Sequence, residues 1–229
     1  MPVRRTVRVA VALAAAGAVA LAGAGCSSSA TSASASVAEN GAEPTTVVGA
    51  GLTTVVEGPK IIVGEAKAPH TATVYLDPRC SYCAKFEEGG AVALAQAAAE
   101  GKVRIEYVVA SFLDARSGGT ASARAANAMR AAAEAGKFAE FQAALFAGGG
   151  AEDPLKVADR VDGLRSPEFD RAVREDTYHD WVASAEKAFE DSGVGGTPTV
   201  LLDGRQVGVG GDALYDQDAF ARVLRDAGV

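Results

Sequence analysis

The stretch Asp77-Pro78-Arg79-Cys80-Ser81-Tyr82-Cys83 decides the fold, because it joins a short apolar run to a helical run. Residues 71–76 before it are apolar and β-branched and predict a buried strand, while the residues from Ala84 onward predict a helix. Two cysteines separated by two residues, at the first turn of a helix that follows a strand, suit reversible dithiol–disulfide chemistry.

Cys80 is the expected nucleophile of this pair. A helix N-terminus carries partial positive charge and free N–H groups, which favour a thiolate and lower its pKa. Arg79 adds a formal positive charge beside it. Cys83 follows three residues later on the same helix face, where it can close the disulfide or resolve a mixed disulfide.

Residues 1–25 are typical of a signal peptide. Met1–Arg8 carries three arginines and no acidic residue, and the sixteen residues 9–24 are all Ala, Val, Leu or Gly. This apolar run is too short and too rich in alanine to predict a membrane span. We therefore expect the folded part of the chain to lie outside the cytoplasm.

Cys26 follows small residues and precedes a serine tract, a pattern similar to a bacterial lipoprotein signal, in which the cysteine is lipidated after cleavage. Gly23 departs from that pattern, which usually has a large aliphatic residue there. We expect lipidation of Cys26 and anchoring to the outer face of the cell membrane, which also accounts for the odd number of cysteines. The alternative is an ordinary secretory signal, an incidental cysteine and a secreted protein.

Residues 26–52 are rich in Ser, Ala and Gly and predict a flexible tether, and residues 53–229 have the size of one domain. Residues 1–25 hold three of the 22 basic residues and none of the 29 acidic ones, so the remainder carries 19 − 29 = −10. This charge argues against nucleic acid or an anionic membrane surface as a partner. Membrane contact is expected only through the lipid.

The cysteine pair has three other interpretations. Structural zinc needs four ligands, but Cys26 is far away in the sequence, and neither His70 nor His179 has ligand spacing to the pair. A fixed structural disulfide would close so short a loop that it adds little stability. Two buried spectator thiols are uncommon in an exported chain. The strand-to-helix placement favours redox chemistry over all three, and no metal is expected.

Around the cysteine stretch, residues 53–56, 61–63 and 103–109 predict further strands. A helix is expected over 84–100, with a kink or close packing at Gly89-Gly90, because interior glycines weaken a helix. The order strand, helix, strand over 71–109 implies parallel pairing.

The second half of the chain predicts helices and then a hairpin. Residues 120–192 are helical by composition, and the apolar side chains of 138–146 fall at helical spacing and belong to the core. Asp203-Gly204 between two β-like runs predicts a hairpin, and 214–226 predicts a final helix. Pro198 stands at a strand start, where it removes a backbone hydrogen-bond donor from the sheet. A cis Thr197–Pro198 bond would let the backbone groups there pair with an extended peptide. The alternative is an ordinary trans proline.

These features together resemble the DsbA-like branch of the thioredoxin superfamily over residues 60–227. The cysteine stretch and the Gly-Thr-Pro-Thr run are specific in combination. The matching segments are Ile62-Val63-Gly64, Ala68-Pro69, residues 77–83, Gly136-Lys137-Phe138 with 141–146, and residues 193–200.

The resemblance implies an α/β thioredoxin-like fold, with a helical insertion at about 115–192 between the second core strand and the cis-proline hairpin. It implies that Cys80 attacks, Cys83 resolves, and Pro198 faces the disulfide. Substrate-binding residues are expected to be Thr197, Pro198, Ser81 and Tyr82.

The expected function is that of an extracytoplasmic thiol–disulfide oxidoreductase without a cofactor, more an oxidase than a reductase. Its partners would be cysteine-containing exported proteins and a membrane redox partner. Two departures leave the redox poise open: family oxidases often have a histidine where Ser81-Tyr82 stand, and many relatives have a buried acid where Val74 stands. The alternative function is a non-catalytic thioredoxin-scaffold lipoprotein that binds a partner or a metal.

Overall fold

The computed structural model describes residues 49–229, and the predictions for the signal peptide, for Cys26 and for the tether up to residue 48 lie outside the described residues. Within 49–229, no helix combines the length and the apolar character needed to cross a bilayer. The elements are β1 (Thr54–Glu57), β2 (Lys60–Val63), β3 (His70–Leu76), α1 (Ser81–Glu88), α2 (Gly90–Ala99), β4 (Val103–Val109), α3 (Leu113–Ser117), α4 (Ala121–Glu134), α5 (Phe138–Ala147), α6 (Pro154–Ala158), α7 (Pro167–Arg174), α8 (His179–Asp191), β5 (Thr199–Leu202), β6 (Arg205–Val207), a 3-10 turn (Ala213–Tyr215) and α9 (Gln217–Asp226).

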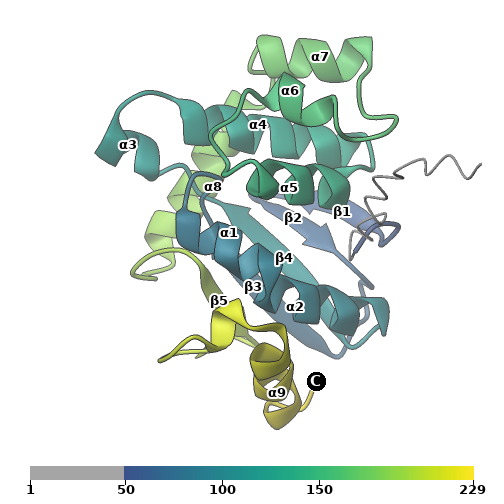
Figure 1. The fold of residues 1–229 in the computed structure, drawn as a ribbon, viewed down its shortest axis with the longest axis vertical. Coiled ribbons are helices and arrows are strands. Elements are labelled where there is room, and N and C mark those ends of the chain that lie inside the picture. The colour runs from purple at the N-terminus through teal and green to yellow at the C-terminus, as the bar shows by residue number, and fades with distance from the viewer. Residues whose placement is uncertain (1–48) are drawn as a thin grey trace, which may run out of the picture. The chain divides into compact units, whose positions relative to one another are not determined.

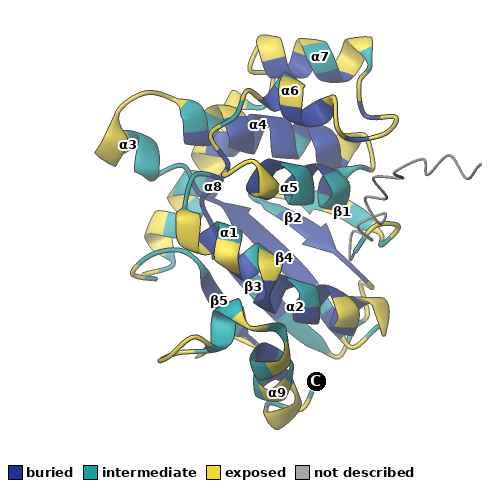
Figure 2. Cartoon of the chain, viewed as in Figure 1, coloured by how far each residue is buried: buried dark blue, intermediate teal, exposed yellow. Residues whose placement is uncertain are grey.

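The strands form one six-stranded sheet in the order β1-β2-β4-β3-β5-β6. β3 and β4 pair in parallel, as the strand–helix–strand order predicted, and the other neighbours pair antiparallel. Helices α1 and α2 cross one face of this sheet (Figure 1). The predicted thioredoxin-like α/β fold is therefore confirmed. Its central strands β3 and β4 are largely buried (Figure 2).

The predicted break in the helix after the cysteines is confirmed, and close packing explains it. A Cβ atom at Gly89 would lie 2.4 Å from the carbonyl oxygen of Tyr215, and one at Gly90 would lie 2.6 Å from that of Leu214. Only glycine lets the two backbones approach this closely. The C-terminal segment is thereby fastened against the helix that begins at the cysteines.

The single final helix predicted over 214–226 is wrong at its start. The chain first makes the 3-10 turn Ala213–Tyr215, whose backbone packs on the two glycines, and α9 begins only at Gln217. Asp216 adopts an extended conformation between the two elements, and its side chain accepts a hydrogen bond from the backbone N–H of Ala219 at 2.7 Å. This cap sets the true start of the helix.

Helices α3 to α8 lie between β4 and β5, where the helical insertion was expected. The side chains of Asp153 and Ser166 cap α6 and α7, and a proline follows each cap in the first turn. The four large apolar residues between 138 and 146 are buried, as predicted. Helix α3 was not predicted, because its five residues are too few to show an apolar period.

Candidate active site

The two cysteines stand at the start of α1 in unlike surroundings. Cys80 is the N-cap residue and is partly exposed, whereas Cys83, in the first turn, is fully buried. The backbone N–H of Cys80 donates to the carbonyl of Asp77 at 3.0 Å, which closes the turn between β3 and α1. Only Cys80 is therefore placed to meet a substrate sulfur.

The loop before β5 reaches the same point from far along the chain. The register of β3 and β5 pairs Tyr75 with Thr199, which brings the start of β5 to the end of β3 where the cysteine turn begins. The Thr197–Pro198 peptide bond is cis, as predicted. The Sγ atom of Cys80 lies 3.3 Å from the carbonyl oxygen of Thr197.

The surroundings drive the two thiol pKa values apart. A hydrogen bond from the Cys83 thiol lowers the pKa of Cys80 to about 5, with further help from the Thr197 side chain and the backbone N–H groups of Cys83 and Tyr82, against the opposing effect of burial. Burial is the largest cause that raises the pKa of Cys83 far above its ordinary value, and its contact with Cys80 adds to this. The Cys80 thiolate and the Cys83 thiol thus stabilise each other's state.

In the reduced protein, we expect the alkylation rate of Cys80 to follow a single titration with a midpoint near pH 5, because the thiolate is the reactive form. At neutral pH about 99% of Cys80 is then thiolate. Cys83 should stay unmodified across this range. Mass spectrometry of the iodoacetamide adducts over a pH series measures both rates; a midpoint near 9, the ordinary value, would contradict this assignment.

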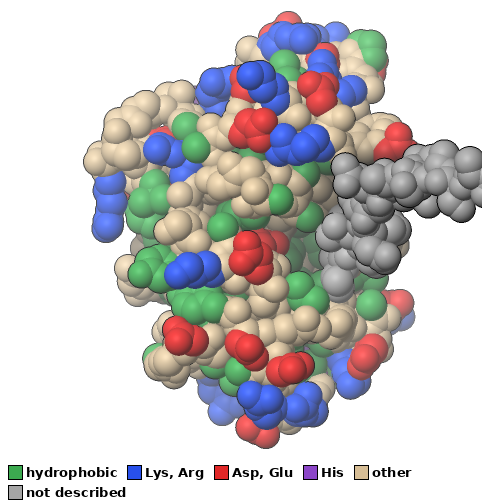
Figure 3. Space-filling view, viewed as in Figure 1, with side chains coloured by type: hydrophobic (Ala, Val, Ile, Leu, Met, Phe, Trp, Pro, Cys, Tyr) green, Lys and Arg blue, Asp and Glu red, His purple; other side chains and the backbone are tan. Residues whose placement is uncertain are grey.

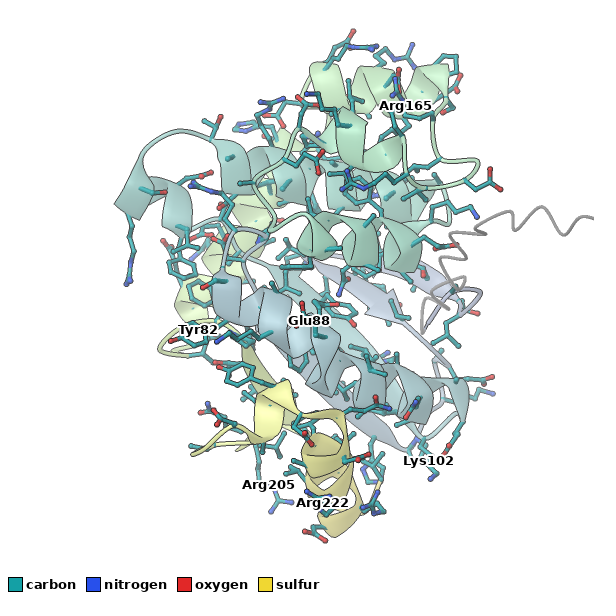
Figure 4. All side chains as sticks on the ribbon, in the orientation of Figure 1. Tyr82, Glu88, Lys102, Arg165, Arg205 and Arg222 are labelled. Carbon is teal, nitrogen blue, oxygen red and sulfur yellow. The ribbon has the colours of Figure 1, made fainter. Side chains whose placement is uncertain are left out.

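Two tyrosines flank Cys80, and one of them was not predicted. Tyr82 is 55% exposed, and its ring centroid lies 5.9 Å from that of Tyr215. The ammonium of Lys85 lies 5.2 Å from the centre of the Tyr82 ring. Burial is the largest cause that raises the pKa of Tyr215, and the charge of Cys80 comes next, which places this phenol close to the sulfur. Figure 4 shows Tyr82 at the start of α1, projecting from the fold.

A buried acid also lies beside the cysteines, at a position that the sequence did not single out. Val74 is fully buried, so the position six residues before Cys80 is apolar, as the sequence indicates. Three residues before Cys80, however, Asp77 has no exposed surface. Burial raises its pKa, and backbone N–H groups and the Ser122 hydroxyl oppose that rise.

A separate cavity of about 350 Å³ lies between α1, α2 and α5 and is mostly apolar. Glu87 lines it and accepts a hydrogen bond from Nε2 of Gln142 at 2.7 Å. Burial raises the pKa of Glu87 to about 7. No three His, Cys, Asp or Glu side chains of residues 49–229 gather where they could hold a metal ion.

The sequence model of a family described as Thioredoxin matches residues 57–226, which is most of the chain and includes both cysteines and Pro198. The chain belongs to the thioredoxin family. A comparison with curated proteins finds no match.

Solved structures of thioredoxin-like proteins share the fold. MdbA, a thiol-disulfide oxidoreductase from Corynebacterium diphtheriae, is 22% identical with a TM-score of 0.60, over 76% of this chain and 92% of that one. MdbA from Actinomyces oris is 20% identical with a TM-score of 0.63, over 75% and 90% of the two chains. DsbA from Mycobacterium tuberculosis is 21% identical with a TM-score of 0.58, over 75% and 94%. The predicted resemblance to DsbA-like proteins is thus confirmed at the level of the fold.

Proposed function

We propose that the protein is an extracytoplasmic thiol–disulfide oxidoreductase that oxidises cysteine pairs in exported proteins through Cys80 and Cys83. The observation that carries this proposal is the pairing of a half-exposed, strongly acidic thiol with a buried, weakly acidic one, next to the Thr197 carbonyl. The solved MdbA and DsbA structures named above support the same activity.

The reaction begins from the Cys80–Cys83 disulfide. A substrate thiolate attacks Sγ of Cys80, the S–S bond breaks, and Cys83 receives the electron pair and then a proton. The second substrate thiolate attacks the substrate sulfur of the mixed disulfide and releases Cys80 as a thiolate. The substrate has lost two electrons and the protein has gained them. A membrane redox partner would then remove these electrons and restore the disulfide.

The surroundings of Cys80 favour oxidation over reduction. The low pKa of Cys80 stabilises the folded reduced protein. This stabilisation is complete at pH values above 9.0, the ordinary pKa of a cysteine, and is lost as the pH falls through about 5. The disulfide form has no thiolate and therefore does not gain this stabilisation. A dithiol that is stabilised in this way makes its disulfide a strong oxidant.

Substrate backbone would be held at Thr197. In the thiol form, Cys80 donates its S–H to the Thr197 carbonyl at 3.3 Å. In the disulfide form that meets the substrate, Cys80 has no proton to donate, so the carbonyl is available to a substrate N–H beside the reacting sulfur. Ser81, Tyr82 and Tyr215 would contact the flanking residues, and Figure 3 shows hydrophobic side chains at the surface beside the start of α1.

A lipid on Cys26 would place this site at the outer face of the cell membrane, within reach of newly exported chains.

The test of the proposed function is direct: the oxidised protein is mixed with a reduced two-cysteine peptide, and the peptide disulfide is quantified by mass spectrometry. Stoichiometric transfer of the disulfide supports the proposal. If the peptide is oxidised no faster than in a buffer control, the proposal is overturned.

A further inference from the structure

The carboxylate of Asp77 joins the cysteine turn to the helical insertion. One oxygen, Oδ1, accepts hydrogen bonds from the backbone N–H of Arg79 at 2.9 Å and from the hydroxyl of Ser122 at 2.8 Å. The other, Oδ2, accepts from the backbone N–H of Leu113 at 3.1 Å. Leu113 begins α3 and Ser122 lies in the first turn of α4, so one buried side chain connects the turn to two helices.

A second, partly exposed set of contacts runs beside the first. The guanidinium of Arg79 donates to the hydroxyl of Ser117 at 2.9 Å and lies 3.5 Å from a carboxylate oxygen of Asp114. Asp114 in turn accepts hydrogen bonds from the backbone N–H groups of Ser122 and Ala123, both at 2.9 Å. The start of α4 is therefore tied to the residue that directly precedes Cys80.

The insertion also presses on the turn from another loop. A Cβ atom at Gly150, between α5 and α6, would lie 1.6 Å from the carbonyl oxygen of Pro78. The residues from Asp77 to Cys80 thus contact both the loop after α5 and the starts of α3 and α4. These two contacts come from different parts of the insertion and share no residue with each other.

We propose that Asp77 is a positioning residue, through which the helical insertion sets the geometry of the cysteine turn and so the reactivity of Cys80. The proposal deepens the proposed function and rests on it. The carboxylate acts through the turn, because its two oxygens are occupied by donors of the turn and the insertion. Towards the buried sulfur of Cys83, Asp77 offers a backbone hydrogen bond.

The chemistry of the site requires a carboxylate. An asparagine has only one acceptor oxygen, so its NH₂ group would face the N–H of either Leu113 or Arg79 and leave that donor unsatisfied. A buried donor without a partner is costly, and the turn would shift to reach another acceptor. The N–H groups of Tyr82 and Cys83, which lower the pKa of Cys80, would move with it.

This role and a purely electrostatic one predict opposite signs. If Asp77 acted only through its negative charge, Asp77→Asn would lower the pKa of Cys80, because a nearby anion disfavours a thiolate. If Asp77 positions the turn, the same substitution raises that pKa, because the thiolate loses hydrogen bonds. Ser122→Ala removes one donor to Asp77, which raises the pKa of Asp77 further and can only reduce its negative charge. Only the positioning role therefore predicts that this substitution raises the pKa of Cys80.

The experiment titrates the thiolate absorbance of Cys80 in the reduced full-length protein, without any turnover. We expect Asp77→Asn to raise the pKa by about one unit, which is tenfold less thiolate at pH values well below the pKa, and Ser122→Ala to raise it by about half as much. As a control, Glu88→Gln removes an exposed charge from the end of α1 (Figure 4) and should not raise the pKa of Cys80.

An unchanged or lowered pKa in Asp77→Asn overturns the proposal, and if that variant does not fold, an unchanged pKa in Ser122→Ala overturns it equally. The readout is separate from the proposed function. If the wild-type protein does not oxidise the peptide, the proposed oxidase activity is refuted, but the titration still tests the role of Asp77. If the pKa shifts with the wrong sign, the positioning role is refuted, but the proposed oxidase activity is not.

Discussion

Replacing Cys80 with serine abolishes disulfide transfer to a two-cysteine peptide, lowering its rate about a thousandfold or more, because the exposed sulfur that accepts the substrate is gone. Replacing Cys83 with alanine has a different result. Cys80, loaded with a small disulfide donor, still reacts with the thiolate of a one-cysteine peptide, which has no second thiol to release it, and the buried Cys83 thiol that would resolve the complex is missing. A covalent complex of protein and substrate should therefore accumulate.

Non-reducing gels and intact mass spectrometry distinguish these outcomes. All variants should be made with and without Cys26→Ser, because Cys26 is the remaining cysteine of the chain and its thiol, where not lipidated, would give adducts of its own. A complex that forms equally in Cys80→Ser and Cys83→Ala would contradict the assignment of Cys80 as the attacking residue.

The second large effect is expected at Gly150. Both Gly149 (φ +74°) and Gly150 (φ +72°) have a backbone conformation that costs alanine about 1 kcal/mol, but only Gly150 is pressed against the Pro78 carbonyl. Overpacking against a backbone atom costs a further 1–3 kcal/mol or so. We therefore expect Gly150→Ala to lower the free energy of unfolding by about 3 kcal/mol.

Gly149→Ala is the matched control, because a Cβ atom there meets no other atom within 4 Å. It should cost only the conformational part, about 1 kcal/mol. Urea unfolding of the reduced proteins, followed by circular dichroism, gives both values. Equal losses in the two variants would show that the contact between the loop and the cysteine turn is unimportant for the fold.

The parts of the fold that could be predicted are those whose signals are local. A buried strand followed by Cys-x-x-Cys, two glycines inside a helix, a Thr-Pro before a strand and an Asp-Gly hairpin each carry their signal within a few residues. In the structure, Asp203 and Gly204 both have positive φ angles, as a tight hairpin turn requires. The resemblance then joined these local signals across the chain.

The parts that were missed depend on contacts between distant segments. Tyr215 reaches the cysteines because Gly89 and Gly90 receive its backbone, and nothing in residues 214–226 alone indicates this. Asp77 stands in the cysteine stretch of the sequence, but the hydrogen-bond donors that connect its carboxylate to the insertion, Leu113 and Ser122, come 36 and 45 positions later. The role of Gly150 becomes visible only in the structure, where its backbone packs against the Pro78 carbonyl.

The central claim is that the Cys80–Cys83 pair works as an oxidant because the reduced form is stabilised by the Cys80 thiolate. The equilibrium reduction potential of this pair, measured against glutathione buffers by mass spectrometry of alkylated thiols, tests it most directly. We predict a value near that of DsbA, about −120 mV. A value near that of thioredoxin, about −270 mV, would contradict the claim and make the protein a reductase.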